Sequence, residues 1–116
     1  PDTIFLMSNL GLVYRDLGQY PQSIQQFEKA LELLKEINSL GQPQAWVLQG
    51  HLASSLKHTG DIDVAFKMIN EVREKQITKL GKDHYDTMVT SDTLGQLCQI
   101  TGREIDALEI LEETYK

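Results

Sequence analysis

The sequence predicts an all-α solenoid of three helix–turn–helix hairpins, six helices in all, from two observations. First, apolar and small residues recur at i, i+3, i+4 and i+7 in two neighbouring stretches, namely Met7, Leu10, Gly11 and Tyr14, then Ile24, Phe27, Leu31 and Leu34. Second, a shift of 42 residues moves Gly18, which separates the two stretches, onto Gly60 and then onto Gly102. A helix with one apolar stripe cannot bury that stripe alone, so we expect paired helices that stack on their neighbours.

The 42-residue register also identifies the positions that hold the hairpins together. Gly11 and Ser23 belong where two helix backbones cross closely, because a larger side chain would separate them. The register divides a single domain, 1–116, into repeats at about 1–42, 43–84 and 85–116. We expect the repeat core to contain the residues that recur in phase: Leu10, Gly11, Tyr14, Gly18, Phe27, Leu52, Ala53, Gly60, Ala65, Leu94, Gly95, Gly102 and Ala107.

The first hairpin is expected to have helices over about 3–17 and 21–39. Gly18 permits a left-handed turn between them, and Pro21 suits the first position of a helix. Gly41 is the expected C-terminal cap, and Pro43 separates this hairpin from the next.

The second hairpin is expected to begin near residue 44 and to turn at Gly60. Asp61 is a favourable N-cap for its second helix, which continues to about Leu80 and stops at Gly81. The third hairpin has expected helices over about 85–100 and from Glu104 onward.

The spacing of these residues resembles the tetratricopeptide repeat (TPR). The matching residues are Met7-x-x-Leu10-Gly11-x-x-Tyr14, then Ser23-x-x-x-Phe27 and Ala30. The resemblance implies a right-handed superhelix whose first helices line a concave groove. It also implies a cytoplasmic scaffold or adaptor that mediates protein–protein interaction.

A second motif narrows the resemblance. Leu80-Gly81-x-x-His84-x-x-Thr87, in a 42-residue register, is similar to the repeats of kinesin light chains and of fungal NLR-type receptors. Because the chain begins at Pro1 and stops at Lys116 inside a helical pattern, we expect a fragment of a larger protein.

The expected groove residues lie about a third of a turn from the core stripe of each first helix. They are Phe5, Ser8, Asn9, Leu12, Arg15, Val47, His51, Ser54, Lys57, His58, Val89, Asp92, Thr93 and Gln96. Basic side chains among them could hold a carboxylate, and amide and hydroxyl groups could bond an extended peptide. The alternative is that the charged members only solvate the groove.

The resemblance also excludes one kind of groove. Chaperone-binding TPRs grip a carboxylate with Lys, Arg and Asn side chains at places that are occupied here by Ser8, Leu12, His51, Val89 and Thr93. All five differ, so a clamp for a chaperone tail is not expected. Asn9 does match the groove-facing Asn that kinesin-light-chain-like repeats use toward peptide main chain.

Composition and spacing argue against several other functions. A net charge of −6 disfavours nucleic acid as the ligand, and no apolar run is long enough to span a membrane. Cys98 falls on an apolar stripe, which indicates an inert buried thiol in a reducing compartment. His51 and His58 are seven residues apart, too far along a helix to share one metal ion. His84 is expected to pack or to cap a helix. We therefore expect no enzyme, cofactor or metal site.

Two functions remain at this point. The first is a scaffold that binds a partner peptide or protein in the concave groove. The alternative is a structural or self-assembly segment of a larger receptor or motor-adaptor complex without its own ligand. The apolar residues Leu108, Ile110 and Leu111 have no following repeat to cover them, which predicts a homo-oligomer through the exposed terminal repeat.

Overall fold

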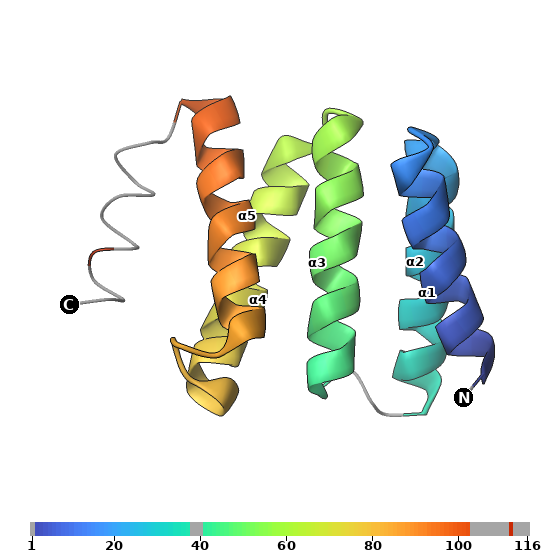
Figure 1. Ribbon diagram of the computed structural model, residues 1–116, viewed down its shortest axis with the longest axis horizontal. Helices are drawn as coiled ribbons and strands as arrows, with labels where there is room; N and C mark the ends of the chain where they lie inside the picture. Colours follow the sequence, from blue (N-terminus) through green and yellow to red (C-terminus); the bar gives the residue numbers. More distant parts are fainter. Residues whose placement is uncertain (1, 38–40, 103–111, 113–116) are drawn as a thin grey trace.

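The computed structural model describes residues 2–37, 41–102 and 112, and within these ranges it contains helices and no strand. The helices are α1 (Asp2–Asp16), α2 (Tyr20–Glu36), α3 (Pro43–His58), α4 (Ile62–Leu80) and α5 (Tyr85–Thr101) (Figure 1). The prediction of an all-α fold is confirmed. The sixth expected helix, with Ala107 and the apolar residues 108–111, lies outside the described residues.

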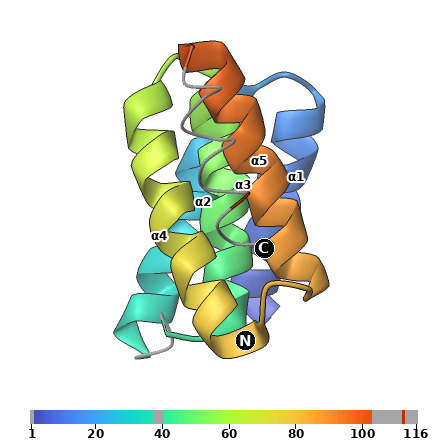
Figure 2. The same cartoon turned by 90° about the vertical axis from the view of Figure 1, so that its left-hand side faces the viewer.

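The helices form two layers. Along the chain each helix packs on the next, and α3 also contacts both α1 and α5. Helices α1, α3 and α5 therefore make up one layer, and α2 and α4 make up the other (Figure 2). No helix of the described chain is long and apolar enough to cross a membrane.

The turns repeat as the 42-residue register predicts. Gly18, Gly60 and Gly102 have φ angles of 77°, 89° and 74°, in the left-handed region that side chains with a Cβ rarely adopt. The N–H of Gln19 donates to the carbonyl of Tyr14 at 2.8 Å, and 42 residues later the N–H of Asp61 donates to the carbonyl of Leu56 at 3.0 Å. The two hairpins thus turn with the same backbone hydrogen bond.

One expected cap is wrong, and a second is confirmed in position but lacks the side-chain hydrogen bond of a cap. Helix α2 ends at Glu36 with Ile37 at its C-cap, so Gly41 does not end this helix. Asp61 occupies the N-cap of α4, but its side chain makes no capping hydrogen bond and instead accepts from the Thr59 hydroxyl at 2.9 Å. Its backbone, with ψ at 55°, is not in the extended conformation from which an N-cap side chain usually reaches the first turn. His84 does cap α5, because its Nδ1 accepts from the Asp86 N–H at 3.1 Å.

The first core cluster joins α1, α2 and α3. Its buried members are Ile4, Phe27, Ala30, Leu34, Ala45, Leu48 and Leu52. A Cβ added at Gly11 would lie 2.6 Å from the Phe27 ring, which confirms that this crossing requires a small residue. Beside this cluster, the buried hydroxyls of Ser23 and Ser55 are hydrogen-bonded at 2.7 Å and connect α2 to α3.

The second core cluster joins α3, α4 and α5 through Ala53, Ala65, Ile69, Leu94, Leu97 and Cys98. Cys98 is a free, buried cysteine, as its place on the apolar stripe predicted. Of the predicted core positions outside these two clusters, Gly11 is buried, Tyr14 and Gly95 are half-buried, and the glycines of the turns are exposed.

Leu10 corrects the prediction for α1. Its side chain is 38% exposed, whereas Ile4, which the predicted stripe omitted, is 2% exposed and packs in the first cluster. The residue 42 places later, Leu52, is buried because α2 covers that side of α3. Among the described residues no helix covers the equivalent side of α1, so the same position stays exposed.

Candidate functional site: the groove of helices α1, α3 and α5

A cavity of about 400 Å³ opens between the helices of the first layer. Its lining comes from α1, α3 and α5, with one residue from α4: Arg15, Trp46, Val47, Gly50, His51, Ser54, Gln76, Tyr85, Asp86, Val89, Thr90 and Thr93. The cavity therefore joins side chains from helices that are far apart in the sequence.

Six predicted groove residues line this cavity: Arg15, Val47, His51, Ser54, Val89 and Thr93. The others do not reach it: Phe5, Ser8, Asn9, Leu12, Lys57, His58, Asp92 and Gln96. Leu12 packs instead against the first core cluster, and the Ser8 hydroxyl donates to the Ile4 carbonyl at 2.8 Å. Phe5, Asn9, His58, Asp92 and Gln96 are exposed on the first layer.

Sequence reasoning missed part of the lining. Gln76 belongs to α4, and the prediction had limited the groove to the first helix of each hairpin. Trp46 of α3 was not among the predicted groove residues, yet it also lines the cavity. Tyr85, Asp86 and Thr90 lie in the first turns of α5. A shift of 42 residues from the predicted groove residues of α3 does not reach these three positions. The short spacing from Asp86 to Val89 and Thr90 on one helical face is the only sequence signal for them.

Arg15 and His51 connect α1 to α3 at one side of the cavity. The Arg15 Nη1 lies 3.3 Å from the His51 Nδ1, and the His51 ring stacks on Phe27 with centroids 5.8 Å apart. Burial, and then the neighbouring Arg15 charge, lower the pKa of His51 below 6.5. The imidazole is therefore neutral at pH 7 and accepts a hydrogen bond from the guanidinium.

His58 and Tyr20 form a second contact at the end of α3. Their rings stack with centroids 4.3 Å apart and planes 10° apart. Partial burial lowers the pKa of His58, and the charges of Lys57 and Arg15 lower it further. The positive potential at this end of the groove thus comes from Lys57 and Arg15, while both histidines are neutral at pH 7.

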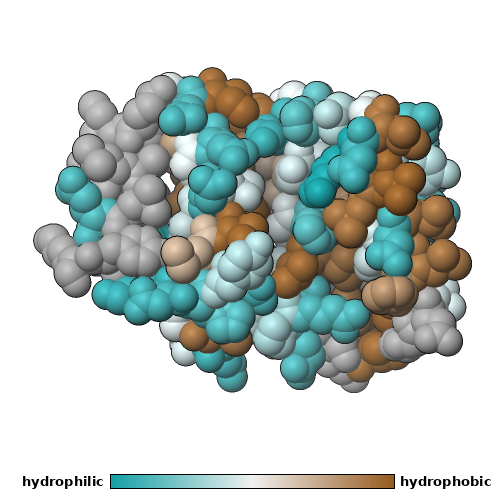
Figure 3. Space-filling view, in the orientation of Figure 1, coloured by the Kyte–Doolittle hydropathy of each residue, from teal (hydrophilic) through white to brown (hydrophobic). Residues whose placement is uncertain are grey.

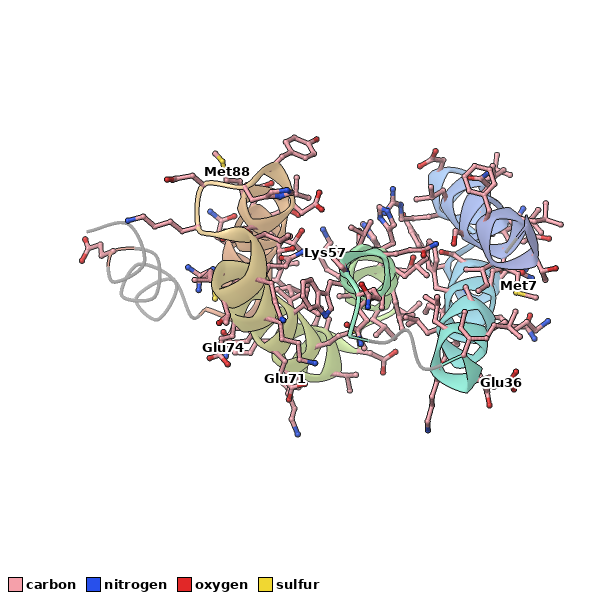
Figure 4. The ribbon with its side chains drawn as sticks, turned by 90° about the horizontal axis from the view of Figure 1, so that it is seen from below. Met7, Glu36, Lys57, Glu71, Glu74 and Met88 are labelled. Carbon is pink, nitrogen blue, oxygen red and sulfur yellow. The ribbon has the colours of Figure 1, made fainter. Side chains whose placement is uncertain are left out.

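A polar chain connects α3 to α5 beside the cavity. Lys57 projects into the space between these helices (Figure 4) and donates to the Gln96 Oε1 at 2.9 Å. Gln96 in turn donates to the Asp92 carboxylate at 3.1 Å. Lys57, Gln96 and Asp92 are thus hydrogen-bonded to one another across α3 and α5, outside the lining of the cavity. Within the described ranges, no group of three or more His, Cys, Asp or Glu side chains could hold a metal ion.

The geometry defines a class of protein, namely a helical-hairpin repeat protein with a groove of polar and apolar side chains along one layer. Comparison of the sequence with family models gives the family. A tetratricopeptide repeat model matches residues 43–116, more than half of the chain, and a second tetratricopeptide repeat model matches residues 5–36. The chain belongs to the tetratricopeptide repeat family, whose repeats generally mediate protein–protein interaction.

Solved structures show the same fold. A Podosopora anserina protein described as a kinesin light chain with nearly identical TPR-like repeats superposes with a TM-score of 0.84 at 20% identity, covering 96% of this chain and 53% of that one. A single-substitution variant of those repeats superposes with a TM-score of 0.81 at 20% identity, covering 99% of this chain and 54% of that one. The chain thus spans about half the length of these relatives. No curated protein sequence matched.

Proposed function

We propose that this chain binds a partner protein by holding an extended segment of it in the groove of α1, α3 and α5. The observation that carries the proposal is the convergence of Arg15, His51 and Thr93 on one cavity, since these residues come from three different helices. Polar groups spaced along such a groove suit the main-chain and side-chain groups of an extended peptide.

Charge supports a partner segment that contains acidic residues. The chain has a net charge of −6, yet Arg15 and Lys57 lie together at one end of the groove. An acidic side chain of the partner would be attracted electrostatically by both cations at this end of the groove. The acidic surface elsewhere on the chain would repel the same side chain.

A matched pair of variants tests the groove. Asn9→Ala with Arg15→Glu should lower partner affinity at least tenfold, because it removes an exposed amide and reverses a charge in the cavity lining. Lys67→Glu makes the same charge change on an exposed site of α4 that does not line the cavity, and it should bind normally. The partner is first captured from native cell extract with the full-length parent protein, and affinity is then measured by calorimetry. Equal affinities for the two variants would exclude the groove.

The proposal also covers the number of repeats and the hand of the superhelix that they form. We infer three repeats stacked as a right-handed superhelix, supported by the family match that continues to residue 116 and by the matching turns of the first two hairpins. We also infer a cytoplasmic location, supported by a single, buried cysteine.

Self-assembly is the second candidate function, and one described surface favours it. Leu6, Leu10 and Val13 lie at i, i+4 and i+7 on α1, and Leu17 directly follows the helix; these side chains are 38–65% exposed. Figure 3 shows apolar side chains gathered over this helix. A second copy packed there would bury this face, and light scattering should then detect a concentration-dependent oligomer that Leu6→Gln with Val13→Gln abolishes. A strict monomer at high concentration would exclude this candidate.

A further inference from the structure

The Arg15 side chain lines the groove cavity and keeps hydrogen-bond donors in reserve. A guanidinium carries five N–H groups, and among the described residues that of Arg15 makes one hydrogen bond, to the Nδ1 of His51 at 3.3 Å. Arg15 and His51 both line the cavity, and both are half-buried, so part of each residue stays in contact with solvent. The guanidinium can therefore bind a second acceptor, one that enters from the groove.

The charges near His51 come from its own helix and from the two neighbouring helices of the first layer. The described charged or titratable groups of the cavity and of its Arg15 end are Arg15 of α1, Lys57 and His58 of α3, and Tyr85 and Asp86 of α5. From the second layer, α2 contributes the uncharged Phe27 ring that stacks on His51, and α4 contributes no titratable group to the described lining. Burial lowers the pKa of His51 most, and of these charges Arg15 lowers it further.

We propose that Arg15 and His51 form a proton-linked carboxylate subsite, in which an acidic side chain of the bound segment binds while His51 takes up a proton from solvent. This inference rests on the proposed peptide-binding function and names the regulation of one part of that groove. Without a ligand, the His51 Nδ1 accepts from Arg15, so the neutral ring carries its proton on Nε2. A bound carboxylate accepts from the guanidinium and from the newly protonated Nδ1, and it offsets the repulsion between the two cations.

Proton uptake and carboxylate binding strengthen each other. A carboxylate beside His51 favours the imidazolium form, and the imidazolium raises the affinity for the carboxylate by the same factor. Affinity for an acidic segment should therefore rise as the pH falls through the range in which His51 titrates, below 6.5. It should decline again only below about pH 5, where the carboxyl group of the ligand itself becomes protonated. A neutral segment lacks the charge and should show no such dependence.

The imidazole signals test the proposal directly. The intact chain is titrated with a capped pentapeptide that has one central Glu, and with a matched peptide that has Gln at this place. Ring ¹H–¹⁵N spectra follow the three histidines over a pH series, and His51→Gln identifies the His51 signal. We expect the Glu peptide to prefer the protonated chain at least threefold, which at saturation raises the pH midpoint of the His51 signal by at least about 0.5 pH unit. The Gln peptide should leave this midpoint unchanged.

Matched variants decide which ring is responsible. His58→Gln removes a ring of the same helix that also senses the Arg15 charge but does not line the cavity, so the pH dependence of binding should persist. His51→Gln should bind the Glu peptide with the same affinity throughout the pH series. Arg15→Gln should weaken binding of the Glu peptide at least fivefold, because it removes the permanent cation of the subsite.

Three results would overturn the proposal. They are an unchanged His51 midpoint at saturation, no saturable binding of the Glu peptide to wild type, and a pH dependence that survives in His51→Gln. Loss of the pH dependence in His58→Gln, with an unchanged His51 midpoint, would assign the proton to the other ring.

The subsite and the groove can fail separately. If Asn9→Ala with Arg15→Glu abolishes partner capture while the Glu peptide leaves the His51 midpoint unchanged, the groove binds its partner without proton uptake by His51. If that double variant keeps full affinity for the captured partner, the groove is not the binding surface, and the proposed function fails even where the peptide result stands.

Discussion

The buried hydrogen bond between Ser23 and Ser55 predicts a strongly non-additive pair of substitutions. Both side chains are 0% exposed, and their hydroxyls lie 2.7 Å apart between α2 and α3. Ser23→Ala removes one partner and leaves the other hydroxyl buried without water, so we expect a loss of about 1–2 kcal/mol in unfolding free energy. Ser55→Ala should cost a similar amount for the same reason.

The double substitution should restore most of this loss. Removing both hydroxyls leaves no unpaired group, and such replacements are close to neutral. The chain supports this reasoning internally, because a shift of 42 residues moves the pair onto Ala65 and Leu97, which are both 0% exposed in the second core cluster. An apolar pair is therefore compatible with this kind of helix crossing. The two single losses would add to about 2–4 kcal/mol, so a near-neutral double variant corresponds to a coupling energy of about 2–4 kcal/mol in its favour.

Urea unfolding of the four proteins measures the coupling. The slopes of unfolding free energy against urea should be equal, so that midpoints report stability alone. Ser54→Ala, next in the sequence but half-exposed, is the control and should change stability by less than about 0.5 kcal/mol. Additive losses in the double variant, or single losses no larger than that of the control, would refute the reasoning.

Three further predictions concern packing and charge. Gly11→Ala should destabilise by about 1–2 kcal/mol in urea unfolding, because its overlap with a buried ring outweighs the helix propensity gained, whereas Gly50→Ala, with open space, should stabilise by about 0.5–1 kcal/mol. Because the pKa of His51 is lowered in the fold, the unfolded chain binds its proton more readily. The unfolding free energy should thus fall as the pH drops through 6.5, and it should fall less in His51→Gln than in wild type. Urea unfolding at several pH values measures this, and equal slopes of unfolding free energy against pH in the two proteins would contradict it. Gln76→Met and Gln49→Met each remove an unpaired buried oxygen, so thermal denaturation should show a higher melting temperature in both.

The repeat architecture could be predicted from the sequence because its signals are local. Gly18 and Gly60 mark the turns, since a left-handed φ angle strongly favours glycine wherever the chain packs. Asp61 as N-cap and Gly81 as the stop predicted a helix that begins after Asp61 and ends at about Leu80, and α4 is observed at Ile62–Leu80. Six of the cavity-lining residues followed from the same periodicity, because a helix presents a given face at every third or fourth residue.

Other features depended on contacts between distant segments, and only the tertiary structure decided them. Leu10 and Leu52 occupy the same place in the register, yet one is exposed and the other is buried, because α2 covers α3 and no described helix covers that side of α1. Gln76 reaches the groove from the second layer because of how α4 packs between α3 and α5. Periodicity determines which side chains share a helical face, whereas burial and pairing depend on which helix is packed against that face.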